Sequence, residues 1–229
     1  MSALEEPTLS EGLATTRSIR RYTDEPVTEE QLSRTLFLAT RAPSGSNRQP
    51  TRFVVLRQGP VALEVRRLLA EGAAEIWSAK RSSDEFPDRA AATPTDRMLA
   101  TMDTYVDRLA EAPVIVLPCM VRYRDPVQTE GGSVYPAVQN LLLGARAVGL
   151  GGALTMFHHV REDEIRAALG IPNEAFIAAT VTLGHPAGSH GPVRRKPLDR
   201  VVFEDRWDNA ASWAVDPEGT RFTGGPNAD

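Results

Sequence analysis

The stretch "TTRSIR" brings two guanidinium groups and a hydroxyl together within four residues, Arg17 to Arg20. A guanidinium presents a rigid fork of N–H donors that matches the oxygens of a phosphate, and Ser18 adds a donor between the two arginines. The stretch is therefore suited to hold a phosphorylated small molecule. Taken alone, it fits a solvated cationic end of a helix better.

Two further stretches carry polar side chains in suggestive places. A loop between a predicted helix and a predicted strand is rich in hydrogen-bond donors, and its glycine lets the backbone approach a ligand closely. This loop contains Ser44, Gly45, Ser46, Asn47 and Gln49. Near the end of the chain, "GPVRRKPLDRVV" contains Arg194, Arg195 and Lys196. By themselves, the two stretches also fit a polar turn and a solubilising run of charge.

The remaining reactive side chains favour structural roles. His158 and His159 are adjacent, so on a strand they would face opposite sides and could not bind one metal ion together. We therefore predict no metal site, although one of the two could line a pocket. Cys119 lies in the apolar run "APVIVLPCMV", which predicts a buried thiol. The acidic run "REDE", 161–164, suits the start of a helix.

Composition and motif content narrow the function classes. The 229 residues carry a formal net charge of -4, so no broad positive field is available for a nucleic acid. No segment approaches the ~18 consecutive apolar residues of a membrane span, and the first residues lack the apolar core of a signal peptide. The sequence also lacks a glycine–lysine phosphate loop, a dinucleotide fingerprint, an HExxH motif and a nucleophile elbow. We expect a cytoplasmic protein with one main domain, 1–207, and a C-terminal extension, 208–229.

The first half of the chain predicts alternating helices and strands. A short helix over 9–16 leads into the arginines, and a second helix begins at the capping-box spacing of Thr28 and Gln31 and ends before Pro43. The polar loop therefore follows a helix end. Further predictions are a strand over 52–57, a helix from residue 60, a surface connection over 80–94, a helix over 95–110 and a strand over 114–119.

The second half repeats this alternation and then loses it. The predictions are a helix that begins near residue 136 and ends at glycines 149–152, a strand over 152–157, a helix over 161–170 and a strand over 175–184. Beyond Gly184 the chain has no apolar stripe of its own. Trp207 and Trp213 in this tail predict anchors at an interface.

In this order, the stretches resemble the FMN-dependent nitroreductase family. The motifs of that family are matched by "TTRSIRRYTDEPV", "APSGSNRQPTRF", "YPAVQNLLLGARAVGLGG" and "GPVRRKPLDRVVFEDRW", which extend from about Arg17 to Trp207. The resemblance implies an α+β fold of three layers, with a mixed, mostly antiparallel sheet flanked by helices. It also implies an intertwined homodimer with FMN at the subunit interface and C-terminal extensions that embrace the partner.

The resemblance further implies which residues bind the phosphate of FMN. Arg17, Ser18 and Arg20 would hold the phosphate and the ribityl chain, and Arg195 would close the clasp. Arg21 would face solvent or a carboxylate. Many family members have a further arginine at the position of Thr16, so one phosphate contact would be lost here or supplied elsewhere.

Two other segments would hold the flavin ring. Asn47 would form a side-chain hydrogen bond to the ring edge, with the rest of its loop alongside: Pro43, Ser44 and Ser46. Backbone amides would reach the ring near N5 and the pyrimidine oxygens from Leu154, Thr155, Met156 and Phe157. A donor near N5 helps a flavin accept hydride. The loops 81–94 and 123–135 would cover the ring, with Tyr135 as a candidate stacking residue.

Two features near the ring depart from the family pattern. Thr51 replaces a frequent tryptophan and would reshape the pocket. The segment "GALTMFHH" replaces a more frequent tryptophan–isoleucine–glycine–glycine version, so the contacts from this segment would differ in their side chains.

The function that follows is an FMN-dependent oxidoreductase. NADH or NADPH would reduce the flavin and depart, and a nitroaromatic, a quinone or an activated alkene would then take two electrons. No dedicated acid or base is predicted, because the cofactor supplies the redox chemistry. Two alternatives stay open: another flavin chemistry on the same fold, such as reductive dehalogenation, flavin destruction or natural-product oxidation, and a flavin-binding protein without turnover.

Overall fold

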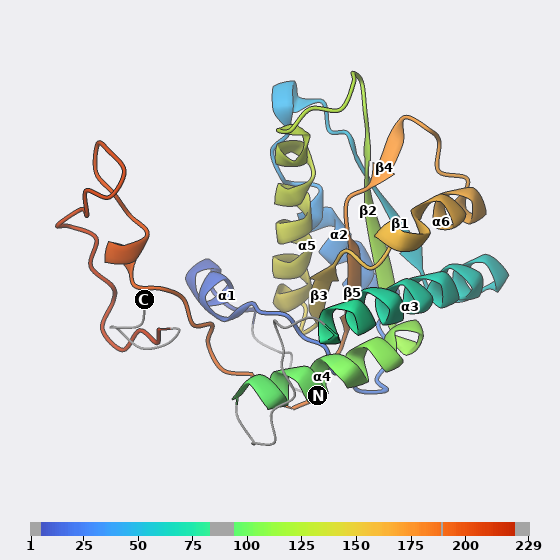
Figure 1. The fold of residues 1–229 in the computed structure, drawn as a ribbon, viewed down its shortest axis with the longest axis horizontal. Coiled ribbons are helices and arrows are strands. Elements are labelled where there is room, and N and C mark those ends of the chain that lie inside the picture. Colours follow the sequence, from blue (N-terminus) through green and yellow to red (C-terminus); the bar gives the residue numbers. More distant parts are fainter. Residues whose placement is uncertain (1–5, 83–93, 189, 223–229) are drawn as a thin grey trace.

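A five-stranded sheet lies between two layers of helices in the computed structural model, which describes residues 6–82, 94–188 and 190–222 (Figure 1). The helices are α1 (Leu9–Thr15), α2 (Glu29–Ala39), α3 (Pro60–Arg81), α4 (Pro94–Asp107), α5 (Tyr135–Ala147) and α6 (Glu162–Leu169). The strands are β1 (Thr51–Leu56), β2 (Val114–Val121), β3 (Gly151–Thr155), β4 (Ala175–Ile177) and β5 (Thr180–Gly184). The predicted three-layer α+β fold is confirmed.

Strand β2 is the centre of the sheet, and both of its faces are buried. The order of the strands is β1-β2-β5-β3, with β4 also paired to β2, and every pair is antiparallel. Successive side chains of a strand point to opposite faces. Ile115 and Leu117 accordingly pack in a core with residues of α3, α4 and α6, whereas Val114 and Val116 pack in a second core with residues of α2 and α5. The apolar run around Cys119 is therefore explained by burial on both sides.

Cys119 is buried as predicted. The residue is only 3% exposed, and burial, with a smaller contribution from the charge of Glu162, raises the pKa of its thiol to about 11. A thiol in this state stays protonated at neutral pH, so its role is packing.

The long helix α3 is tied to the sheet by a buried arginine. Arg66 donates through Nη1 to the carbonyl oxygens of Ala110 and Ala112, at 2.9 and 2.6 Å, and through Nη2 to Leu56 at 2.7 Å. Burial lowers the pKa of Arg66. Because a buried guanidinium must find acceptors, these bonds fix α3 against the end of β1 and the turn that leads into β2.

Several predicted boundaries of helices and strands are correct, but one segment predicted as a single strand forms two strands. Helix α2 begins at the predicted capping box, in which Thr28 and Gln31 each accept a backbone N–H. The strand predicted over 175–184 is instead two strands, β4 and β5, which pair with different parts of β2. The break lies opposite Pro118, whose carbonyl accepts from Ala178 at 2.8 Å but which has no N–H to continue the ladder.

Other differences from the predicted elements are smaller. Helix α4 ends at Asp107, and a short 3₁₀ turn, Leu109–Glu111, follows it. Strand β3 ends at Thr155 rather than at residue 157, because Thr155 forms the last pair with β5. Helix α3 continues to Arg81, and most of the connection predicted over 80–94 lies outside the described residues.

The two terminal segments of the described chain meet beside the sandwich. Ser18 forms a parallel bridge with Gly152 of β3, which adds an N-terminal arm to the sheet edge. Further on, Val193 donates its N–H to the carbonyl of Ala14, and the chain then extends away from the sandwich, as the orange-to-red segment of Figure 1 shows. Among the described residues, no helix is both long and apolar enough to cross a bilayer.

Candidate functional site

The arginine-rich arm lies along the start of β3. The Ile19 N–H donates to the carbonyl of Gly152 at 2.8 Å, and the Ile19 side chain is buried. The arm is extended here, so neighbouring side chains point in different directions. Arg17 accordingly lines one cavity, whereas Arg20 lines another.

The cavity beside Arg17 is small and cationic. Its volume is about 220 Å³, and it is lined by the arm, the C-terminal end of α5 and the start of β3: Thr15, Thr16, Arg17, Ile19, Leu142, Arg146, Gly149, Leu150, Gly151, Gly152, Pro186, Gly188 and His190. Burial, together with the charges of Arg17 and Arg21, lowers the pKa of His190. An anion in this cavity would offset the repulsion between a protonated His190 and the two arginines. The Thr16 hydroxyl is buried and has no hydrogen-bond partner among the described residues.

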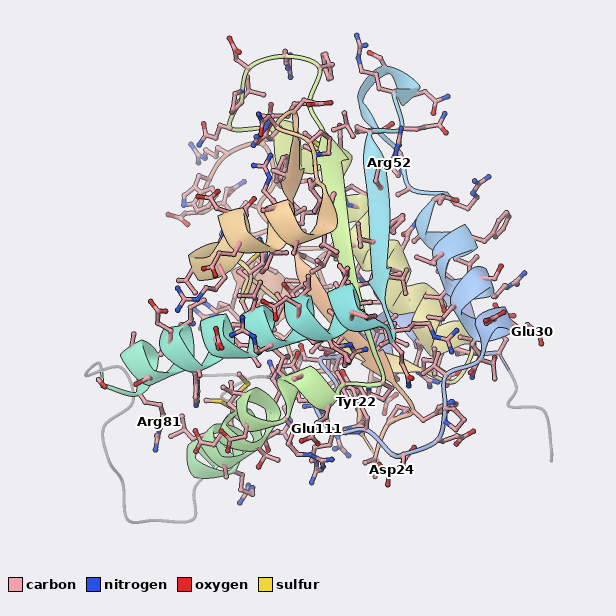
Figure 2. The ribbon with its side chains drawn as sticks, turned by 90° about the vertical axis from the view of Figure 1, so that its right-hand side faces the viewer. Tyr22, Asp24, Glu30, Arg52, Arg81 and Glu111 are labelled. Atoms are coloured by element: carbon pink, nitrogen blue, oxygen red, sulfur yellow. The ribbon has the colours of Figure 1, made fainter. Side chains whose placement is uncertain are left out.

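The cavity beside Arg20 is larger, at about 920 Å³, and carries charges of both signs. Figure 2 shows three of its residues, Tyr22, Asp24 and Glu111, at one end of the molecule. The Tyr22 hydroxyl lies 2.7 Å from Oγ1 of Thr182, which is also 2.9 Å from the Tyr105 hydroxyl.

Arg20 lies close enough to Tyr22 and Tyr105 for its charge to affect both, and one of its N–H donors has no partner among the described residues. Burial raises the pKa of Tyr105 to about 12 and raises that of Tyr22 further, while the charge of Arg20 lowers both. The Arg20 Nε atom is buried with no partner within the described part of the chain. A buried guanidinium donor without a partner indicates a place for a water molecule or an anionic ligand. No sequence pattern predicts the Tyr22–Thr182–Tyr105 cluster, because its members come from three distant segments.

The polar loop is held in a strained backbone conformation. Ser46, Asn47 and Gln49 all have φ between 51 and 52°. The left-handed region is costly for residues with a Cβ, and such residues gather at ligand sites. Ser44 stabilises the loop, because its Oγ accepts the Gln49 N–H at 2.9 Å, and the Gly45 N–H donates to Oγ of Ser133 at 3.2 Å.

The predicted covering loop 123–135 contacts this polar loop. The Arg48 guanidinium lies 4.1 Å from the ring centroid of Tyr123, a residue with most of its surface exposed. Tyr135 donates its hydroxyl proton to the carbonyl of Ala178 at 3.2 Å and remains partly exposed. Glu130 of this loop forms an ion pair with Arg122, which directly precedes the loop. Both loops therefore lie near the N-terminal end of α5.

The predicted ring-contact segment is at the end of β3. Leu154, Thr155 and Met156 are half-buried, and Thr155 donates through Oγ1 to the carbonyl of Thr180 at 3.3 Å. The Phe157 side chain is buried in the core near Tyr105. Only the backbone of Phe157 is therefore available to a ligand on the surface.

The C-terminal residues lie partly beside the arm. Arg17 donates through Nη1 to the carbonyl of Gly191 at 3.4 Å. Arg195 is exposed, donates to the carbonyl of Arg194 and forms an isolated bridge with Phe222. Neither cavity is lined by Arg195 in the single chain.

Two groups of the predicted site residues therefore lie at opposite ends of α5. Arg17 lies with Arg146 at the C-terminal end, whereas the loop of Asn47 lies with Ser133 at the N-terminal end. The 13 residues of α5 span about 20 Å. Figure 2 shows the same separation, because Arg52, which donates to the carbonyl of Gln49, lies at the end of the molecule opposite Tyr22.

The structure corrects the reasoning about the two histidines. The sequence predicted that His158 and His159 lie on a strand and face opposite sides. The strand ends at Thr155, and both residues lie in the turn that follows, with ring centroids only 4.5 Å apart. The predicted helix start at "REDE" is confirmed, because Glu162, Asp163 and Glu164 form the first turn of α6.

The fold is an α+β sandwich, and the arm, the C-terminal end of α5 and the start of β3 enclose a small cavity lined by two arginines. The sequence pattern of the nitroreductase family matches residues 13–185. A protein named NADH dehydrogenase from Thermus thermophilus is 32% identical over 205 residues, which cover 82% of this chain and 91% of that protein. The chain belongs to the nitroreductase family and is an oxidoreductase, as the motifs predicted.

Solved structures agree with this assignment. A mutant of the FMN and NADPH-dependent nitroreductase NfnB from Sphigopyxis sp. strain HMH is 25% identical, with a TM-score of 0.62, and the match covers 88% of this chain and 100% of that one. Nitroreductase A from Vibrio parahaemolyticus is 21% identical, with a TM-score of 0.64 over 88% of this chain and 77% of the other. The second likeness shows the shared fold.

Proposed function

We propose that this protein is an FMN-dependent NAD(P)H oxidoreductase that reduces an electron-poor acceptor, such as a nitroaromatic, a quinone or an activated alkene. Family membership supports the reaction class, and the similar NfnB structure is of an FMN and NADPH-dependent enzyme. The observation that carries the proposal is the cationic end of α5, where Arg17 and Arg146 line one small cavity, together with the buried Nε atom of Arg20 on the same arm, which has no partner among the described residues.

The donors at this end fit the phosphate of FMN. The Thr16 hydroxyl lies in the cavity of Arg17, whereas Arg20 lines the larger cavity. The Thr16 hydroxyl and the Arg20 Nε atom are both buried and lack partners among the described residues, so each would gain a hydrogen bond from a different part of the phosphate and ribityl chain. Arg17 adds a charge-assisted donor. A cavity of about 220 Å³ is smaller than the usual pocket for a whole cofactor, so it suits the phosphate alone.

A second copy of the chain would supply the rest of the site. We propose a homodimer in which the cationic end of one protomer faces the polar loop of the other, because the two groups lie about 20 Å apart within one chain. Exposed apolar residues support a large interface: Trp207 is 83% and Trp213 66% exposed, and Leu9 and Leu13 on α1 are also exposed. The extension 208–229 would cover the partner, outside the main domain 1–207.

Within this site, each group of residues has a distinct task. Arg17, Ser18, Arg20 and, across the assembled interface, Arg195 would bind the phosphate and ribityl chain. Asn47 would orient the ring, and the backbone of 154–157 would donate toward its reactive edge. When bound, FMN supplies the hydride chemistry, so the chain needs no dedicated catalytic acid or base. The nicotinamide and the acceptor would use the same ring face in turn, which gives ping-pong kinetics.

The test is to reconstitute the purified protein with FMN and follow its visible absorbance. NADH or NADPH should bleach the oxidised flavin, and menadione or a nitroarene should restore the colour. Initial rates at several acceptor concentrations should give parallel double-reciprocal lines. A protein that does not bind FMN, or whose bound flavin stays oxidised with both nucleotides, would contradict the proposal.

A further inference from the structure

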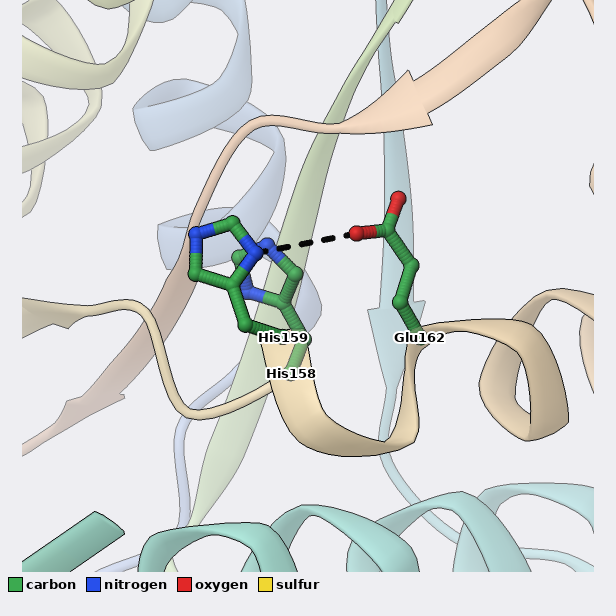
Figure 3. Close-up of side chains that lie close together, drawn as sticks. All are labelled: His158, His159 and Glu162. Atoms are coloured by element: carbon green, nitrogen blue, oxygen red, sulfur yellow. Dashed lines mark ion pairs between the residues drawn. The ribbon is translucent and has the colours of Figure 1, made fainter.

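Three side chains with metal-binding atoms converge where β3 leads into α6 (Figure 3). One atom each from His158, His159 and Glu162 lies within 4.8 Å of the other two. His159 Nδ1 and Glu162 Oε2 are 3.7 Å apart. The 3₁₀ turn His159–Arg161 produces this arrangement, because it curls the backbone so that residues on both sides of the turn face one point.

The buried member of this cluster has an unused nitrogen. His158 is 0% exposed, and its Nδ1 lies 3.1 Å from Oγ1 of Thr180. Its Nε2 is buried and has no hydrogen-bond partner in the described ranges of the chain. Figure 3 shows the His158 ring directly beside the line that joins His159 to Glu162. A buried imidazole nitrogen without a partner is costly unless a ligand satisfies it.

The protonation of His158 is compatible with metal binding. If Nδ1 carries the proton and donates to Thr180, the lone pair of Nε2 is free. A metal-binding histidine typically has its other nitrogen fixed by such a second hydrogen bond.

We propose that His158, His159 and Glu162 form a binding site for a divalent transition-metal ion, with Zn²⁺ as the best match and a fourth position open to water. Two imidazoles and one carboxylate are a donor set that suits Zn²⁺, whereas Mg²⁺ and Ca²⁺ prefer oxygen alone.

The separations and the exposure agree with such a site. Tetrahedral coordination with bonds of ~2.1 Å places ligand atoms roughly 3.4 Å apart, so small side-chain rotations suffice. The His159 side chain is 60% exposed and that of Glu162 24%, which leaves a path from solvent. The nearby cation Arg161 is already paired with Glu75 and Glu164, which reduces its repulsion of a metal ion.

A metal ion at this position would join the end of β3 to the first turn of α6. It would therefore fix the turn that follows residues 154–157, the segment proposed to meet the flavin ring. The site does not depend on the proposed function, because its ligands are protein side chains outside the two cavities.

The experiment uses the full-length, tag-free protein without FMN, freed of metal by a chelator. Isothermal titration with ZnCl₂ should show one ion per chain, and Co²⁺ should give the strong visible absorption of tetrahedral coordination, which excess Zn²⁺ removes. His159→Ala and Glu162→Gln should each weaken Zn²⁺ binding at least 10-fold, since even loss of an outer-shell partner costs ~10–100-fold. His159 is mostly exposed, so its variant should fold, which circular dichroism checks.

His185→Ala is the matched control. His185 Nδ1 lies 3.7 Å from Glu25 Oε2, the same separation as in the His159–Glu162 pair, but this pair belongs to no three-donor cluster among the described residues. The control variant should bind Zn²⁺ like the wild type. No binding by the wild type, a Co²⁺ spectrum of octahedral type, or equal losses in the His185 and His159 variants would overturn the proposal. None of these results bears on FMN binding.

Discussion

The residues around the two ends of α5 differ in charge and in backbone conformation. At the C-terminal end, the cations Arg17 and Arg146 line one small cavity together with His190, and the protein concentrates positive charge there. At the N-terminal end, the loop of Ser46 and Asn47 instead stores backbone strain and presents exposed polar groups. Charge attracts an anion from a distance, whereas a strained loop fixes the direction of individual hydrogen bonds.

Under the proposed function, this difference would explain why the site needs residues from two protomers. Each end provides what the other lacks, but about 20 Å of helix separates them. The proposed dimer would place the charged end of one chain against the polar loop of another.

Truncation after Pro192 should have the largest effect. It removes Trp207, Trp213 and Arg195, so the shortened protein should be monomeric or insoluble and should lack flavin. Size-exclusion chromatography with light scattering, and the visible spectrum, measure both outcomes. Arg195→Ala in the full-length chain distinguishes loss of flavin from loss of the dimer, because it should weaken FMN binding yet leave the dimer intact. A stable, yellow, dimeric truncated protein would show that the extension is not needed.

Loss of either arm arginine should weaken FMN binding substantially. Arg17→Ala or Arg20→Ala removes a charge-assisted contact worth about 1.5–3 kcal/mol, which corresponds to ten-fold or more in the dissociation constant. Fluorescence titration of FMN measures this change, and the loss should shrink at high salt for exposed Arg17 more than for half-buried Arg20. Arg67→Ala is the control, since Arg67 pairs with Glu64 and Glu71 on the surface of α3. Equal affinity in all three variants would remove the phosphate assignment.

Changes in the polar loop should have smaller and separable effects. Asn47→Ala should weaken FMN binding by about 0.5–1.5 kcal/mol, a few-fold, because one neutral hydrogen bond is lost. Ser46→Gly should leave FMN affinity almost unchanged but raise the melting temperature, because glycine adopts the φ of 52° without strain. If Ser46→Gly lowered the melting temperature, the loop would not store the inferred strain.

The pH dependence from His190 should be the smallest effect. Its pKa lies below the ordinary value because of burial and of the charges of Arg17 and Arg21. A bound phosphate would raise this pKa, so binding takes up protons, and His190 would strengthen FMN binding as pH falls through the range below its ordinary value. The ratio of FMN affinities of wild type and His190→Asn should therefore increase as pH decreases from 7.5 to about 5.5. A ratio of affinities that does not change with pH would contradict the placement of the phosphate beside His190.

Much of the fold could be predicted because its signals are local. The capping box of α2, the two-sided apolar run of β2 and the proline at the start of α3 each act through neighbouring residues. The break between β4 and β5 could not be predicted so directly, since the missing N–H belongs to Pro118 on another strand. The same holds for the end of β3, which is set by where its partner strand ends.

For the site, the sequence by itself determined which side chains are present, their order and the family to which they belong. The roles of Arg17, Asn47 and Arg195 toward FMN stay predictions. Only the tertiary structure decided that Arg17 and Arg20 line different cavities, that the loop lies a helix length away, and that His158 and His159 meet at Glu162. The physical reason is that chemical identity resides in single residues, whereas proximity arises from pairing and packing between segments far apart along the chain.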